Sequence, residues 1–146
     1  MTSSNLSIVV DTREQEPYSF DSQGVTVVRK ALPAGDYSLV GSETTFAIER
    51  KSLADFVTSL IHDRARFLRE LRLLATYDFA SIVVEGSLED LVAHRYRSGA
   101  SPLAILGTAY SIIIDFGVPI FFCCDRQLAR RFVEGLLVRY NLKVQR

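Results

Sequence analysis

The segment 46–56 constrains this chain more than any other, because an apolar run leads through three consecutive charged residues straight into a helical pattern. Residues 46–48 are typical of a buried strand, and Glu49, Arg50 and Lys51 follow at its end. Alternate residues of a strand point to opposite sides, so Glu49 and Lys51 share one face and Arg50 lies on the other. Burying such charges is unfavourable unless they are paired or needed for function. The segment therefore predicts a strand whose end carries a chemical site.

The length and composition predict a single domain over residues 1–146. The chain is 48% hydrophobic and 23% charged, which is sufficient for one core. Its 17 basic and 17 acidic residues cancel, so any electrostatic argument must be local. The N-terminal residues lack the features of an export signal, and no apolar run reaches the roughly 18–20 residues of a membrane span. We expect an intracellular protein with no membrane contact, cytoplasmic or nucleoid-associated, or in the host cytoplasm if phage-encoded.

Hydrophobic periodicity predicts a mixed α/β domain. Strands are expected at 6–10, 25–30, 37–40, 46–51, 81–85 and 119–123. Helices are expected at 52–61, 64–76, 87–93, 103–116 and 127–140. Along the last helix, the residues expected to share the apolar side are Leu128, Phe132, Gly135, Leu136 and Tyr140. Early strands followed by helices alternating with two more strands predict a mixed sheet with helices on both faces.

An additional acid stands upstream of the charged strand end. Asp36 follows Gly35 and precedes an apolar run, so the order is an aspartate, a gap, and then Glu49 and Lys51 separated by one residue. This order matches the carboxylate and lysine spacing of a metal-dependent phosphodiesterase site. The alternative interpretation makes Asp36 an ordinary turn residue, and Glu49 with Lys51 a surface pair on the strand.

Asp11 and Glu14, at the end of the first strand, add two more acids. Two carboxylates about 5 Å apart repel by roughly 3 kcal/mol at an effective dielectric near 20, so converging acids require a cation, a proton or arginine. Carboxylate oxygens are the hard ligands that Mg²⁺ (or Mn²⁺) prefers, whereas two distant histidines and two adjacent cysteines make no zinc-ligand set. The alternative is an ion-pair network in which Arg13, Arg50 and Lys51 offset the acids.

Four motifs then occur in order along the chain. They are Val-Asp-Thr-Arg-Glu at 10–14, Gly-Asp-Tyr at 35–37, Ile-Glu-Arg-Lys at 48–51 followed by Asp55, and the stretch 59–67. Together they resemble the XPF-type nuclease domain, a branch of the PD-(D/E)XK restriction-endonuclease-like superfamily. The glycine usual after the first helix is absent here, and we expect neither a helix-hairpin-helix module nor a helicase region. It is therefore similar to compact bacterial or phage single-domain members.

The resemblance implies a restriction-endonuclease-like mixed central sheet and a metal-dependent DNA endonuclease acting on branched or junction-containing DNA, in repair or recombination. The expected metal ligands are Asp36 and Glu49, as the resemblance also implies, with the backbone carbonyl of Arg50 as a third. Asp11 and Glu14 would complete the acidic rim by direct or water-mediated metal contact. The implied catalytic residues are Asp36, Glu49, Lys51 and Arg50. Lys51 would orient or help to deprotonate the attacking water and stabilise developing charge. Arg50 has an alternative role as an interior ion-pair partner of Asp11 or Glu14.

Two acids are candidates for a supporting position. Asp55 lies three residues after Ser52, where an acid in the first turn stabilises a helix by about 0.3–1 kcal/mol, so capping alone explains it. Glu85 ends a predicted strand and lies either near the site or at the start of the next helix.

Arginine-rich and aromatic positions are candidates for DNA contact. They are Arg13, Arg64, Arg66, Arg69, Tyr96 and Arg97. Arginines beside a nuclease site can contact phosphate without reading sequence, and a tyrosine can stack on an unpaired base. The alternatives are a solvated helix face for 64–72 and an ordinary exposed loop for 94–102.

The partner expected besides DNA is a second subunit. The resemblance implies a homodimer, or a dimer with a related subunit, through the C-terminal half, where 103–114 and 121–122 are strongly apolar. These runs are otherwise core. Two other functions compete with the endonuclease: a catalytically weak nuclease-like module that binds DNA or a partner, and a nucleotide-binding protein. No glycine-rich phosphate loop supports the latter.

Overall fold

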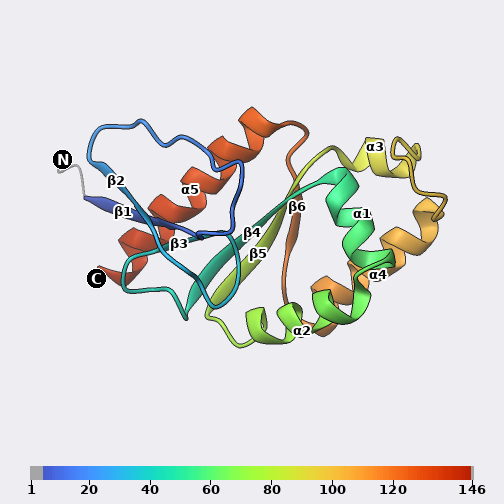
Figure 1. Ribbon diagram of the computed structural model, residues 1–146, viewed down its shortest axis with the longest axis horizontal. Helices are drawn as coiled ribbons and strands as arrows, with labels where there is room; N and C mark the ends of the chain where they lie inside the picture. Colours follow the sequence, from blue (N-terminus) through green and yellow to red (C-terminus); the bar gives the residue numbers. More distant parts are fainter. Residues whose placement is uncertain (1–4, 146) are drawn as a thin grey trace.

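The computed structural model describes residues 5–145, which form one mixed six-stranded sheet in the order β2-β1-β3-β4-β5-β6 (Figure 1). The strands are β1 Leu6–Val10, β2 Val25–Arg29, β3 Tyr37–Leu39, β4 Phe46–Ser52, β5 Phe79–Glu85 and β6 Ile120–Phe122. The helices are α1 Leu53–Ile61, α2 Arg64–Leu74, α3 Leu88–Val92, α4 Pro102–Asp115 and α5 Arg126–Val144. β3 runs antiparallel to β1 and β4, and the other pairs are parallel. The predicted α/β class and mixed sheet are confirmed.

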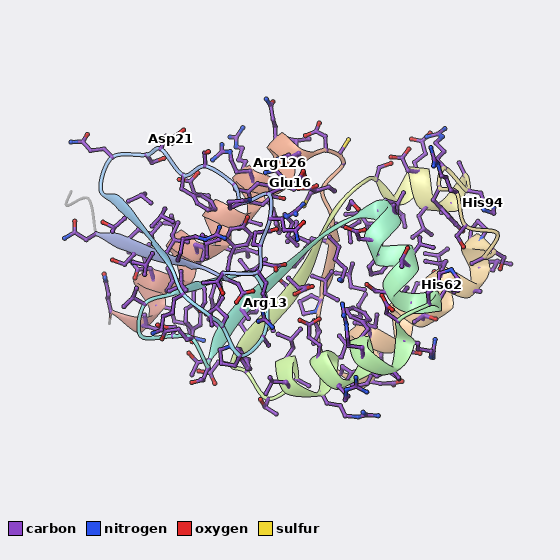
Figure 2. The ribbon with its side chains drawn as sticks, viewed as in Figure 1. Arg13, Glu16, Asp21, His62, His94 and Arg126 are labelled. Atoms are coloured by element: carbon purple, nitrogen blue, oxygen red, sulfur yellow. The ribbon has the colours of Figure 1, made fainter. Side chains whose placement is uncertain are left out.

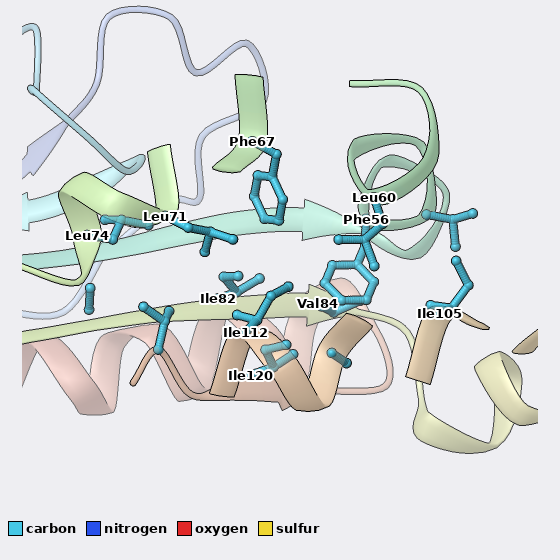
Figure 3. Packing of buried hydrophobic residues seen from close by; sticks show 14 of the residues in the cluster. Phe56, Leu60, Phe67, Leu71, Leu74, Ile82, Val84, Ile105, Ile112 and Ile120 are labelled. Atoms are coloured by element: carbon cyan, nitrogen blue, oxygen red, sulfur yellow. The ribbon is translucent and has the colours of Figure 1, made fainter. Parts of the chain in front are cut away.

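Helices cover both faces of the sheet, as the sequence predicted. On one face, α1, α2 and α4 pack on β4 and β5, and Figure 3 shows Leu71 and Ile112 close to Ile82 of β5 and Phe56 further along the strand, close to Val84. On the other face, α5 and the segment after β1 cover the inner strands, with Val133 among the buried residues of that second cluster. The charged end of β4 therefore lies between two separate cores.

The C-terminal half divides its apolar residues between core and surface. In α4, Ile105, Ala109 and Ile112 are buried, whereas Leu103 and Ile114 are 82% and 77% exposed. The apolar run 103–114 is therefore part core and part surface.

The predicted apolar side of the last helix is wrong for most of its residues. The buried residues of α5 are Ala129, Val133, Leu137 and Tyr140. Of the predicted set, only Tyr140 is buried, and Leu128 and Phe132 are 49% and 38% exposed. The helix carries two apolar rows one residue apart, and only contact with the sheet decides which row is covered.

Element boundaries agree with the sequence prediction to within a few residues, and helix caps account for the starts. Ser52 accepts a hydrogen bond from the Asp55 N–H at 3.0 Å at the start of α1, and Ser87 with Asp90 forms a complete capping box on α3. Because Ser52 also ends β4, the strand passes into α1 without a loop, which fixes α1 beside the charged residues. Within residues 5–145, no helix combines the length and apolar content needed to cross a bilayer.

Candidate active site

The pleat of β4 separates its charged residues as the sequence predicted. Ala47 packs with the α1, α2 and α4 side of the sheet, so Glu49 and Lys51 share that face, whereas Ile48 and Arg50 face α5. Glu49 is only 7% exposed. The Lys51 Nζ lies 3.2 Å from the Glu49 Oε2, so the two residues form a largely buried ion pair.

A tight turn places Asp36 against the end of β4. The Asp36 N–H donates to the Ile48 carbonyl at 2.8 Å, and the Arg50 N–H donates to the Asp36 Oδ2 at 2.7 Å. Gly35 has φ +81°, and a Cβ on it would lie 2.9 Å from the Ala47 Cβ. Glycine is therefore required for the close approach that holds the Asp36 carboxylate beside Glu49 and Lys51.

One pocket joins these groups to helix α2. It lies between the end of β4 and the polar side of α2, and it is partly open to solvent. The charged residues that line it are Asp11, Arg13, Asp36, Glu49, Lys51, Asp63, Arg66, Arg69 and Glu70. The pocket brings together the Asp36, Glu49 and Lys51 that the sequence assigned to one site.

Burial makes the two central carboxylates weak acids. Burial, with the nearby carboxylates of Glu14 and Glu70, raises the pKa of Asp36 to about 7 against the hydrogen bond from Arg50. Burial, followed by the charges of Asp36 and Glu70, raises the pKa of Glu49 well above its usual value. Near neutral pH, two such groups retain a proton or require a nearby cation.

This donor set fits a hard divalent cation. Mg²⁺ is commonly bound by one or two carboxylates and keeps several waters, so Asp36 and Glu49 meet its usual requirement. The Arg50 N–H points toward Asp36, and in a strand the carbonyl of the same residue points to the same side, which makes it a fitting third oxygen. Burial and neighbouring carboxylates raise the pKa of both carboxyls, and a cation bound beside them would favour their charged forms.

Asp11 lines the pocket but its oxygens already have partners. Arg13 donates through Nε to the Asp11 Oδ2, and the Leu32 N–H donates to the Asp11 Oδ1, both at 2.8 Å. Burial alone would raise the pKa of Asp11, but these hydrogen bonds hold it below its usual value. Asp11 therefore fixes the loop that carries Arg13, and any contact with a cation would compete with both bonds.

Glu14 and Glu85 lie on the opposite side of β4, around Arg50. The Arg50 Nε donates to the Glu14 Oε2 at 2.7 Å, and its Nη1 donates to the Glu85 Oε1 at 3.1 Å. Burial would raise the pKa of Glu14, but the hydrogen bond and the charge of Arg50 keep it below its usual value. The bond to Glu14 is also the main cause of the raised pKa of Arg50. Arg50 thus pairs with Glu14, one of its two proposed ion-pair partners.

The four predicted metal ligands are consequently divided. Across residues 5–145, no three side chains from histidine, cysteine, aspartate and glutamate converge as a metal-binding group. Asp36 and Glu49 share the pocket, Asp11 lies at its wall, and Glu14 lies behind the strand. Figure 2 places Arg13 by the central strands and the two histidines, His62 and His94, apart from each other in the helical half.

The predicted DNA contacts are dispersed. Arg13, Arg66 and Arg69 are exposed and line the pocket, whereas Arg64, also exposed, lines a different groove between α1, α2 and α4.

The loop after α3 offers less to an incoming base than its sequence suggested. The Tyr96 ring stacks on His94 with centroids 4.3 Å apart, and its hydroxyl donates to the Ala100 carbonyl at 2.6 Å, so one ring face is already covered. Arg97 is exposed. Asp55 is exposed at the start of α1 and does not line the pocket, which agrees with its capping role.

Sequence reasoning missed Glu70, which lines the pocket opposite Asp36 and Glu49 and acts on the pKa of both. A signal was present, because Glu70 lies four residues after Arg66 and therefore on the same side of α2.

Sequence reasoning missed Tyr18 as well. Its hydroxyl donates to the Glu85 Oε2 at 2.5 Å, and burial together with this bond raises its pKa. A tyrosine in a polar loop gave no comparable signal.

Comparison with known proteins gives consistent matches. Residues 10–136 match the family model described as the ERCC4 domain. The chain is 30% identical over 141 residues to the 3'-flap repair endonuclease Xpf of Saccharolobus solfataricus, covering 93% of this chain and 56% of that relative. The chain thus spans about half the length of that curated relative.

Solved structures agree with the sequence matches. XPF from Aeropyrum pernix is similar with a TM-score of 0.70 and 27% identity, over 93% of this chain and 65% of that one. The same protein in complex with DNA is similar with a TM-score of 0.72 and 28% identity, over 94% of this chain and 66% of that one.

Proposed function

The chain belongs to the ERCC4 domain family, and we propose that it is a metal-dependent DNA endonuclease that hydrolyses phosphodiester bonds in branched or junction-containing DNA. The observation that carries the proposal is the pocket in which Asp36, Glu49 and Lys51 meet beside exposed arginines. The relative named as a 3'-flap repair endonuclease and the similar structure solved in complex with DNA support the choice of branched DNA as the substrate. Since its substrate is DNA, we expect the enzyme inside the cell.

Each residue of the pocket has a role that its position supports. Asp36 and Glu49 would hold Mg²⁺ or Mn²⁺, with the Arg50 carbonyl as a third oxygen. The bound ion would supply the Lewis-acid chemistry, activating water and offsetting charge on the phosphate. Lys51, held by Glu49 at 3.2 Å, is placed to orient the attacking water and to stabilise negative charge on the phosphate oxygens.

The exposed arginines around the pocket would position the DNA backbone. Arg66 and Arg69 of α2 and Arg13 of the loop after β1 all line the pocket, so phosphates bound at its opening would meet arginines from two parts of the chain. These contacts fix the position of the strand and carry no sequence information. Such a site suits recognition by backbone shape more than by base sequence.

A dimer is part of the same proposal. Residues of β6 and α5 form an apolar surface, here called the β6–α5 surface, made of Phe121, Phe122, Leu128, Phe132 and Leu136. Large exposed apolar patches on otherwise ordinary proteins mark interaction sites. We propose that a second copy, or a related subunit, covers the β6–α5 surface.

The experiment that tests the activity is cleavage of flap, splayed-arm and linear DNAs with Mg²⁺ or Mn²⁺. Glu49→Gln and Lys51→Ala should each lose at least about 100-fold in cleavage rate, the usual effect of removing a charge-stabilising group. Asp55→Asn serves as a control, because Asp55 lies outside the pocket, and its rate should be unchanged. Equal cleavage by wild type, Glu49→Gln and Lys51→Ala would refute the site.

One observation favours a second candidate, a catalytically weak nuclease-like module that binds DNA or a partner. Two of the four expected ligands, Asp11 and Glu14, are engaged by arginines, which leaves fewer free carboxylates for a cation. DNA binding without cleavage of any substrate in the panel would favour this module over the enzyme.

A further inference from the structure

Arg50 is held behind the proposed active site by two glutamates from distant parts of the chain. Its Nε and Nη2 donate to the two carboxylate oxygens of Glu14 at 2.7 and 3.0 Å, and its Nη1 donates to Glu85 at 3.1 Å. The side chains of Arg50, Glu14 and Glu85 are 13%, 6% and 12% exposed. A planar guanidinium engaged by both glutamates has a fixed orientation.

Tyr18 holds Glu85, the second carboxylate that pairs with Arg50. Its hydroxyl donates to the Glu85 Oε2 at 2.5 Å, and its ring stacks on Tyr37 with centroids 5.4 Å apart and an interplanar angle of 10°. The Tyr18 N–H donates to the Tyr37 hydroxyl at 2.8 Å. Tyr18 therefore links the loop after β1 to β3 and to the end of β5.

Arg126, at the start of α5, completes the network. Its guanidinium lies 4.7 Å from the centroid of the Tyr18 ring, and it donates to Glu85 at 3.4 Å and to the Glu16 carbonyl at 2.7 Å. Figure 2 shows Arg126 and Glu16 side by side near the start of α5. Since α5 carries part of the β6–α5 surface, the network connects the proposed dimer contact to the strand of the proposed site.

The network has a direct route to the site through the backbone of Arg50. The Arg50 N–H donates to the Asp36 Oδ2 at 2.7 Å, and Arg50 stands between Glu49 and Lys51 in sequence. Fixing the Arg50 side chain on one face of the sheet therefore fixes the strand end that presents Glu49 and Lys51 on the other face, next to Asp36. A buried ion pair is weak evidence for stability, since apolar residues of similar volume often serve as well. A role in positioning explains why charged residues stand here.

We propose that Tyr18, Glu85 and Arg126 are positioning residues, which hold Arg50 so that β4 presents Glu49 and Lys51 to Asp36. The proposal rests on the proposed endonuclease function for its effect on cleavage. Its structural content, the constraint on the Arg50 backbone, can be measured in the metal-free protein without any substrate.

The first experiment measures amide hydrogen exchange of Arg50 by NMR in metal-free protein. Tyr18→Phe and Glu85→Gln should each accelerate exchange of the Arg50 amide by about tenfold, as expected for loss of a hydrogen bond to a charged group. The matched control is Tyr77→Phe, which removes a hydroxyl that donates to the Glu43 carbonyl outside the network. The control should change exchange at Arg50 by less than about twofold.

The second experiment measures single-turnover cleavage at saturating DNA and metal. Tyr18→Phe should lower the rate about tenfold while the Kd for DNA stays within about twofold, because the hydroxyl acts on the placement of reacting groups and not on DNA. Arg126→Ala should lower the rate in the same way. Arg130→Ala, which removes an ion pair with Glu134 on the same helix, should leave it unchanged.

Combining variants separates positioning from general destabilisation. The double variant Tyr18→Phe with Glu85→Gln should cleave no more slowly than the worse single variant, because both remove the same constraint. Unchanged Arg50 exchange in both single variants would overturn the proposal, and so would equal acceleration at every amide of β1 and β5. If wild type cleaves no DNA, the proposed function fails, and the exchange measurement alone still decides the positioning role.

Discussion

Replacing Asp36 with asparagine should stabilise the metal-free protein while abolishing cleavage. The pKa of Asp36 is about 7 in the fold, against an ordinary value of 3.8, so the folded state keeps a proton that the unfolded chain has already released. Stability therefore falls as pH rises through this window, and the loss is complete above about pH 7. The amide of asparagine has no charge to bury and retains an oxygen that can accept the Arg50 N–H.

The size of the effect follows from the two pKa values. A tenfold change in proton affinity corresponds to about 1.4 kcal/mol, so the interval from 3.8 to about 7 corresponds to about 4 kcal/mol. Asp36 is partly exposed to the pocket, and solvent there screens the charge. We therefore expect a gain of about 2 kcal/mol in the free energy of unfolding at pH 8, and less than about 1 kcal/mol at pH 5.

Urea unfolding in the presence of EDTA at pH 8 and at pH 5 measures this difference. Asp63→Asn is the matched control, because Asp63 lines the same pocket but is exposed, and its effect should stay within about 0.5 kcal/mol. A loss of stability in Asp36→Asn at pH 8 would refute the reasoning. An equal gain at both pH values would refute its electrostatic cause.

The remaining predictions concern the metal, the turn and the dimer. Mn²⁺ should raise the melting temperature of wild type more at pH 8 than at pH 6, because Asp36 must lose its proton to bind the ion. Differential scanning fluorimetry should detect no such rise in Asp36→Asn. An equal rise in both proteins would place the ion elsewhere. Gly35→Ala should lower the free energy of unfolding by about 1–3 kcal/mol in urea melts, since φ is +81° and the new Cβ would lie 2.9 Å from the Ala47 Cβ. Unchanged stability would contradict the close approach of Gly35 to Ala47. Phe132→Glu should convert a dimer to a monomer in light scattering. Val40→Glu is the control: Val40 is also exposed but lies outside the β6–α5 surface, so this variant should stay dimeric. A wild-type monomer at high concentration would remove the dimer proposal.

The charged residues of the site form two sets with different effects on the stability of the metal-free fold. The Lys51–Glu49 pair and the bonds around Asp36 hold two carboxylates together at a cost to the metal-free fold. The network around Arg50 is electrically balanced, because Glu14 and Glu85 match Arg50 and Arg126. Of these two sets of residues, only the one around Asp36 and Glu49 has more acids than bases, and a bound cation there would offset the excess negative charge.

Local sequence patterns determined which β4 side chains share a face, where the helices and strands lie, and which family the chain belongs to. The pleat of an extended strand has a period of two, so residues 46–51 alone required Glu49 and Lys51 to share a face opposite Arg50, and the structure has them so. Helix caps and apolar spacing located the elements for the same reason, since each depends on residues close in sequence. The order of the motifs was sufficient to predict the family to which the chain belongs.

Only the tertiary structure decided which acids face which arginines. Glu14 is 36 residues from Arg50 and Tyr18 is 67 residues from Glu85, and no local pattern specifies either contact. The same holds for α5, where two adjacent apolar rows were equally suited to the core until the sheet covered Val133 and left Phe132 exposed. Contacts of this kind depend on how distant elements pack, and packing is a property of the whole fold.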